Sequence, residues 1–158
     1  MRYLKILLIL LCLGVPALAA TVPNSVITTQ VPRAYKAQIV NGTGTNPVTI
    51  ATAGTNGTKI SSILCTDTDT SGYTLTFSIV RSATTYVFVV VQIPASSGNL
   101  NGTVPLNVMS STVLPGLPVD TNNNPYFYLE STDTLQFAST GTVASPKVVS
   151  CGTVAEDF

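Results

Sequence analysis

The sequence predicts an all-β protein, built as a single antiparallel β-sandwich or barrel-like domain with an extended N-terminal arm. Short segments rich in Val, Ile, Thr, Tyr and Phe alternate with turns rich in Gly, Asn, Asp, Ser and Pro, at intervals typical of all-β folds. The sequence contains no heptad pattern, long amphipathic helix or repeat of about 20 to 50 residues. Its 158 residues are enough for one domain.

Three regions are expected: a leader (1–20), an extended arm (21–35) and a β-domain (36–158). In the leader, two basic residues precede an apolar run at 6–15 and small residues follow it, which is the pattern of a secretory signal peptide cleaved after Ala19 or Ala20. The apolar run is short for a membrane-spanning helix. Contact with a membrane is therefore expected only through an uncleaved leader.

Eight segments of the β-domain are predicted strands: 36–41, 47–52, 59–66, 73–80, 85–93, 125–130, 134–139 and 147–151. The 73–80 segment alternates cleanly, so Leu75 and Phe77 are expected on a face that packs on the core. The 85–93 segment is apolar on both faces, which predicts a central strand or an interface strand. Residues 106–114 fit either a short helix or a strand.

Composition excludes several functions. Only 9% of the residues are charged, and after the leader five basic and seven acidic side chains give a net charge of −2. Binding of nucleic acid is not expected, because it requires a basic face. The chain has no His, which excludes Ser-His-Asp and Cys-His nucleophile systems and His-ligated metals. We expect a protein that is not an enzyme and that needs no cofactor.

Two cysteines, Cys65 and Cys151, remain after the leader. An even pair in an exported chain permits one disulfide, and two buried free thiols are the alternative.

Two Asp-rich turns, 67–72 and 120–124, present alternating oxygen ligands as calcium loops do. In the first turn the twelfth position is Ser78, where a calcium loop carries a bidentate Glu, so polar turns are the expected structure. A calcium site would require both turns to converge on one point. The candidate ligands are Asp67, Asp69, Ser71, Asp120, Asn122 and Asn124.

Several short motifs of this sequence are similar to motifs found together in one group of known proteins. The arm carries Pro23-Asn24-Ser25, then Gln30 and Pro32-Arg33, and further motifs lie at 52–60, 67–72, 75–79, 117–120, 124–126 and 156–158. Together they resemble small structural proteins of tailed bacteriophages that are encoded among the head genes. The resemblance covers the chain from residue 21 onward.

The resemblance implies a non-enzymatic virion component, a decoration protein on the surface of the phage head. Its partners would be other protein subunits, either the major capsid protein or copies of itself, so a homo-oligomer is expected. Strand addition by the arm to a neighbouring subunit would supply the contact. The expected contact residues are Val22, Pro23, Asn24, Ser25, Val26, Ile27, Thr28, Thr29, Gln30, Val31, Pro32 and Arg33.

Two other functions remain open. An exported bacterial surface or adhesin-like subunit would share the β-architecture, but it requires a cleaved leader and a disulfide between Cys65 and Cys151. A small carbohydrate-binding module would stack sugar rings on Tyr126, Phe127 or Tyr128, for which core or subunit contacts are the alternative.

Overall fold

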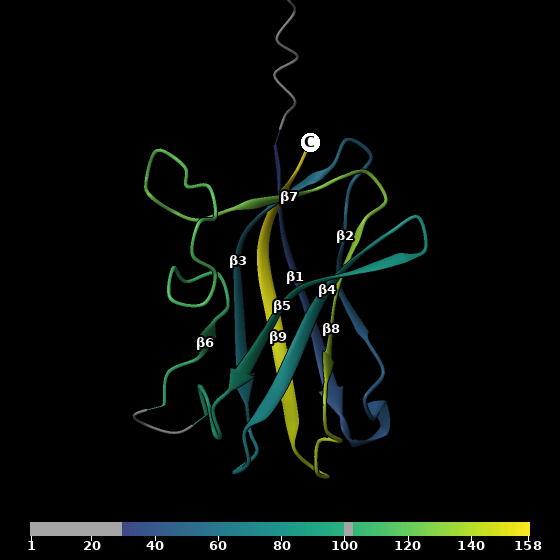
Figure 1. The fold of residues 1–158 in the computed structure, drawn as a ribbon, viewed down its shortest axis with the longest axis vertical. Helices are drawn as coiled ribbons and strands as arrows, with labels where there is room; N and C mark the ends of the chain where they lie inside the picture. Colours follow the sequence, from purple (N-terminus) through teal and green to yellow (C-terminus); the bar gives the residue numbers. More distant parts are fainter. Residues whose placement is uncertain (1–29, 100–102) are drawn as a thin grey trace, which may run out of the picture.

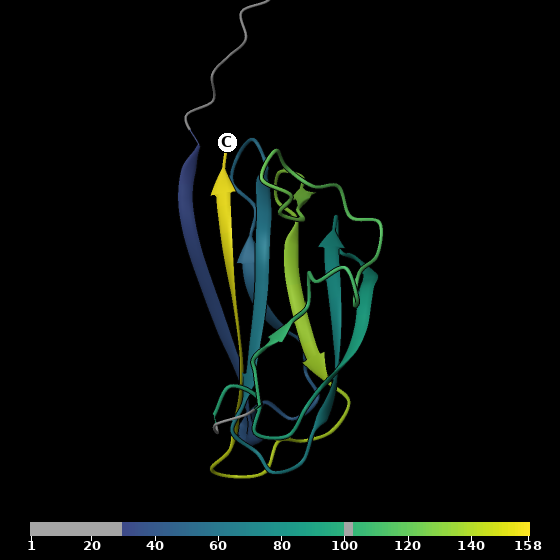
Figure 2. The same ribbon diagram turned by 90° about the vertical axis from the view of Figure 1, so that its left-hand side faces the viewer.

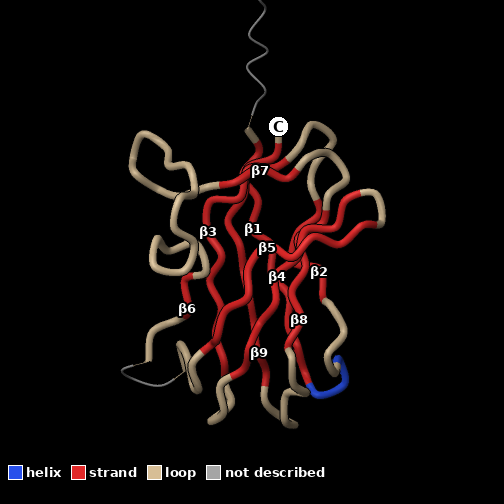
Figure 3. Tube along the Cα trace, in the orientation of Figure 1, coloured by secondary structure: helices blue, strands red, loops and turns tan. Residues whose placement is uncertain are grey.

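The computed structural model describes residues 30–99 and 103–158. The predicted leader and residues 21–29 of the arm lie outside this range. The elements are β1 (Val31–Val40), a 3-10 turn η1 (Asn41–Thr43), β2 (Val48–Thr52), β3 (Thr58–Asp67), β4 (Tyr73–Arg81), β5 (Thr84–Ile93), β6 (Leu106–Asn107), β7 (Phe127–Leu129), β8 (Thr134–Ser139) and β9 (Val148–Asp157), as Figures 1 and 3 show. In the described part no helix is long and apolar enough to span a membrane.

Two antiparallel sheets pack face to face, as the side view shows (Figure 2). One sheet has five strands in the order β1-β9-β3-β6, with β7 also paired to β3. The other has four strands in the order β2-β8-β4-β5. The predicted all-β fold is confirmed, and of the two architectures expected it is the sandwich.

The core fills the space between the sheets with side chains from the inner faces of both. Leu75 and Phe77 of β4 are fully buried, and the Phe77 ring stacks on Phe137 of β8 with 5.8 Å between centroids. Ile60 and Ile63 of β3 enclose the core from the opposite sheet. The alternation of segment 73–80 therefore predicted the buried face correctly, because side chains alternate between the faces of a strand.

Four elements differ from their predictions. β9 was predicted at 147–151 but extends to Asp157. β1 begins at Val31 rather than at residue 36, because its first residues pair with the end of β9. β5 is not a central strand, since it is the outermost strand of its sheet. The alternative, an interface strand, stays a prediction. Of residues 106–114, only Leu106–Asn107 form a strand, and the remainder is turns.

Candidate interaction surfaces

The end of the predicted arm is built into the sandwich. Val31 pairs with Asp157, and Pro32 with Glu156, so the last residues assigned to the arm form the start of edge strand β1. Proline is tolerated there because an edge strand leaves one row of backbone groups unpaired. The boundary between arm and β-domain therefore lies at residues 30–31, five residues before the predicted one.

A polar cluster fixes this end of β1 to the C-terminal strand. The Arg33 Nε donates to Asp157 Oδ2 at 2.9 Å, and the Thr58 hydroxyl donates to Asp157 Oδ1 at 2.5 Å. Burial of Asp157 acts to raise its pKa, but the bonds from Thr58 and Arg33 outweigh burial and leave the pKa below its usual value. The first residues of β1 are thus fixed beside the C terminus (Figure 1).

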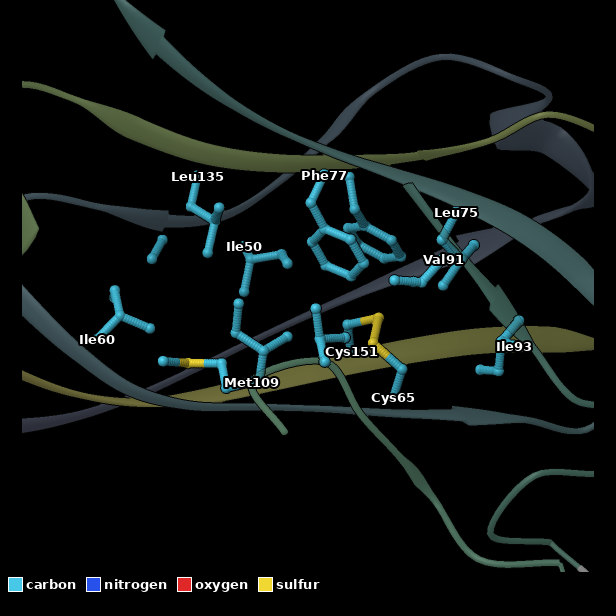
Figure 4. Close-up of a cluster of buried hydrophobic side chains, with 14 of the residues drawn as sticks. Ile50, Ile60, Cys65, Leu75, Phe77, Val91, Ile93, Met109, Leu135 and Cys151 are labelled. Carbon is cyan, nitrogen blue, oxygen red and sulfur yellow. A yellow bond between two sulfur atoms is a disulfide. The ribbon is translucent and has the colours of Figure 1, made fainter. Parts of the chain in front are cut away.

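The two cysteines of the β-domain are joined. Cys65 of β3 and Cys151 of β9 lie directly opposite each other across the antiparallel pair and form a disulfide. Both are buried in the core cluster, on the side across from Phe77 (Figure 4). Of the two states left open by the sequence, the structure therefore has the disulfide.

The first Asp-rich turn follows β3 and is held by its own side chains. Asp67 Oδ1 accepts the Asp69 N–H at 2.7 Å, and Asp69 accepts the Ser71 N–H and the Tyr73 hydroxyl. The hydrogen bond from Tyr73 holds the pKa of Asp69 below its usual value, whereas burial raises the pKa of Asp67. Asp67 Oδ2 is buried and has no hydrogen-bond partner among the described residues.

The second Asp-rich turn is closed in the same way. Asp120 Oδ1 accepts the backbone N–H groups of Asn122 and Asn124, each at 2.9 Å, and these bonds lower the Asp120 pKa. This turn lines a groove with Lys59, at the start of β3, whereas Asp67 ends β3. Lys59 and Asp67 lie eight positions apart along this extended strand, a span of about 26 Å.

The two turns therefore do not converge, and the condition set for a calcium site is not met. The carboxylates of Asp67, Asp69 and Asp120 act instead as hydrogen-bond acceptors that close turns. Ser71, Asn122 and Asn124 donate backbone N–H groups to these carboxylates. Within residues 30–99 and 103–158 no three acidic, Cys or His side chains group as metal ligands would.

The aromatic run of β7 is divided between core and surface. Phe127 is buried, whereas the Tyr128 ring is exposed and meets the Tyr126 ring edge-on at 5.3 Å. The Lys59 ammonium lies 5.2 Å from the centre of the Tyr126 ring and pairs with Glu156 at 3.4 Å. A groove of about 460 Å³ therefore lies beside this aromatic cluster. The Lys59 ammonium already covers the Tyr126 ring.

β5 presents the most exposed apolar surface in a regular strand. It pairs with β4 on one side only, and its second edge makes no backbone hydrogen bond within the described residues. Three of its large apolar side chains are more than half exposed, namely Tyr86 at 56%, Val87 at 64% and Val90 at 56%. The sequence offered the signal for this surface, because the segment is apolar on both faces and carries no charge.

The turn end of the β4–β5 hairpin is fixed by an ion-pair network that sequence analysis did not predict. Arg81 Nε and Nη2 bond both oxygens of Asp133, the shortest contact being 2.6 Å, and Arg81 Nη1 bonds Glu130 at 2.8 Å. The hydrogen bonds from Arg81 hold the Asp133 pKa below its usual value. No local pattern identifies such a pair, since the two residues lie 52 positions apart.

No protein-family model matches the chain, and no characterised protein matches its sequence. The fold and the surfaces described above define the class of molecule, a disulfide-linked antiparallel β-sandwich.

Proposed function

We propose that the chain is a non-enzymatic structural subunit of a phage head, a decoration protein that binds neighbouring subunits through its arm and its β-domain. The observation that carries this proposal is that Val31, Pro32 and Arg33, the last of the expected contact residues, start edge strand β1. Strand addition to a neighbour uses an extended segment, and residues 21–29 come directly before this edge strand in the sequence. The proposed location is the outer surface of the virion head.

The distribution of charge supports a role in assembly rather than in catalysis. Asp133 and Asp157 are held by arginines, and Asp69 and Asp120 close turns. General acid and base chemistry requires two carboxylates that face a common substrate cavity. Asp120 and Glu156 line one groove, but Asp120 is held by turn N–H groups and Glu156 pairs with Lys59. A surface with few charges also loses little hydration free energy when it packs against other subunits.

Deletion of residues 21–29 tests this proposal, since it removes the arm but leaves β1 intact. We expect the shortened chain to melt as the full chain does and to be lost from assembled particles. A chain with the same nine residues in scrambled order is the matched control for length and composition. Unchanged incorporation of the shortened chain into purified particles would refute the proposed function.

The disulfide favours a second candidate, an exported bacterial surface subunit. A bond between Cys65 and Cys151 is expected in an oxidising compartment and is rare in the cytoplasm, where phage heads assemble. Mass spectrometry of the native protein separates the two candidates. A mature N terminus at Ala20 or Thr21, with a mass two hydrogen atoms below that of the reduced chain, supports export. An intact reduced chain in virions supports the decoration protein.

A further inference from the structure

The unpaired edge of β5 has only one of the features by which sheet proteins prevent edge-to-edge pairing, a β-bulge within its pairing with β4. Proteins protect such edges with charged residues, proline, very short strands or bulges. Edge strand β1 contains Pro32, Arg33 and Lys36, and β2, β6 and β7 are five residues long or shorter. β5 has ten residues, none of them charged and none a proline.

A bulge gives β5 an unusual distribution of side chains over its two faces. The pairing with β4 moves from Phe77–Val89 to Ser78–Val87, so Phe88 is an extra residue on β5. Val90 pairs with Thr76 and Val87 with Ser78, and these two β4 residues share the outer face. Val87 and Val90, three residues apart, therefore both lie on the outer face, whereas a regular strand would place them on opposite faces.

This distribution makes β5 complementary to an antiparallel copy of itself. If Thr84 lies opposite Ile93 of a second copy, then Thr85 lies opposite Gln92, Tyr86 opposite Val91 and Val87 opposite Val90. In each of these pairs both residues belong to the same face of the sheet: 84, 86, 91 and 93 are inner, and 85, 87, 90 and 92 are outer. The register is symmetric, so each pair occurs twice about the two-fold axis.

The chemistry of the paired side chains is also matched. On the outer face, polar Thr85 meets polar Gln92 and apolar Val87 meets apolar Val90. Apolar cross-strand pairs stabilise antiparallel sheets, and an uncharged strand brings no like charges together across the axis. All three large apolar side chains that β5 exposes would lie in this contact.

We propose that two copies of this chain pair through β5 in this register and join their four-stranded sheets into one continuous eight-stranded sheet. The occupant of the edge is a second copy because the face pattern and the lack of charge fit β5 itself. The dimer does not depend on the capsid partner proposed above, since it uses only the described residues of β5. Its presence or absence is therefore measured independently of incorporation into particles.

Sedimentation velocity of the full chain provides the test, with variants that probe the register. We expect a dimer that Val87→Lys/Val90→Lys weakens by at least about tenfold, because it places lysines opposite each other. Val87→Lys/Val90→Glu is expected to retain the dimer with a new dependence on salt, because each lysine then faces a glutamate. Val154→Lys, at a 54% exposed valine of the other sheet, is the matched control and is expected to leave the dimer unchanged.

A full chain that stays monomeric at about 1 mM would overturn the proposal, as would a dimer that tolerates both lysines. A dimer lost equally with lysine–lysine and lysine–glutamate would overturn the register. Circular dichroism and thermal melting of each variant show that it is folded. If the double-lysine variant does not fold, the lysine–glutamate variant and its salt dependence still decide the register.

Discussion

Reduction of the disulfide between Cys65 and Cys151 is expected to destabilise the protein substantially. The bond joins residues 86 positions apart, and the chain-entropy relation for a loop of that length gives about 4.6 kcal/mol at 25 °C. Single domains are typically stable by only about 5 to 15 kcal/mol, so the cross-link would supply a third or more of the total. The contribution arises in the unfolded state, where the bond limits the number of conformations.

Equilibrium unfolding in urea, with and without reductant, measures this contribution. Because the chain has no Trp, circular dichroism or tyrosine fluorescence is the signal. The folded chain keeps both sulfur atoms in its core with and without reductant. The difference between the two free energies of unfolding therefore measures the effect of the covalent link alone. The dependence of unfolding free energy on urea should also steepen after reduction, since the unfolded chain then exposes more surface.

The variant Cys65→Ala/Cys151→Ala is the control and should respond to urea identically with and without reductant. A loss below about 1 kcal/mol on reduction of the wild-type chain would contradict the chain-entropy argument. It would mean that the unfolded chain is already restricted by other contacts.

Three further substitutions test the packing and the ion-pair network. Asp133→Asn should lower the free energy of unfolding by about 2 kcal/mol, less than for a fully buried pair because Arg81 is 42% exposed. The hydrogen bonds from Arg81 hold the folded-state pKa of Asp133 below its usual value. The wild-type advantage should therefore persist above about pH 5 and shrink as the pH falls through the folded pKa, and a constant difference down to about pH 2 would contradict this assignment. Phe77→Ala should cost about 3 to 5 kcal/mol by urea unfolding, whereas Tyr128→Ala, at an exposed ring of β7, should cost less than about 1 kcal/mol. Similar losses for the two aromatic substitutions would show that the assigned core is wrong.

The candidate site was predictable in part. The Asp-rich turns were located correctly, and the structure gives their carboxylates the turn-closing role that the missing ligand at Ser78 favoured over calcium. The Arg81–Asp133 pair was not predictable, because it forms only when β4 and β8 lie side by side. The groove beside Tyr126 likewise joins residues from β3, β9 and a distant turn.

The sequence alone determined the all-β class and most strand positions, because alternation of side chains and turn-forming residues are local properties. Only the tertiary structure decided which strands are edges and which cysteine state fits the fold. Segment 85–93 suggested a central or interface strand because it is apolar on both faces. Whether a strand is central depends on how many strands pair with it, and β5 pairs with β4 only. Cys65 and Cys151 meet because the register between β3 and β9 places them opposite each other, and that register is fixed by contacts distant in sequence.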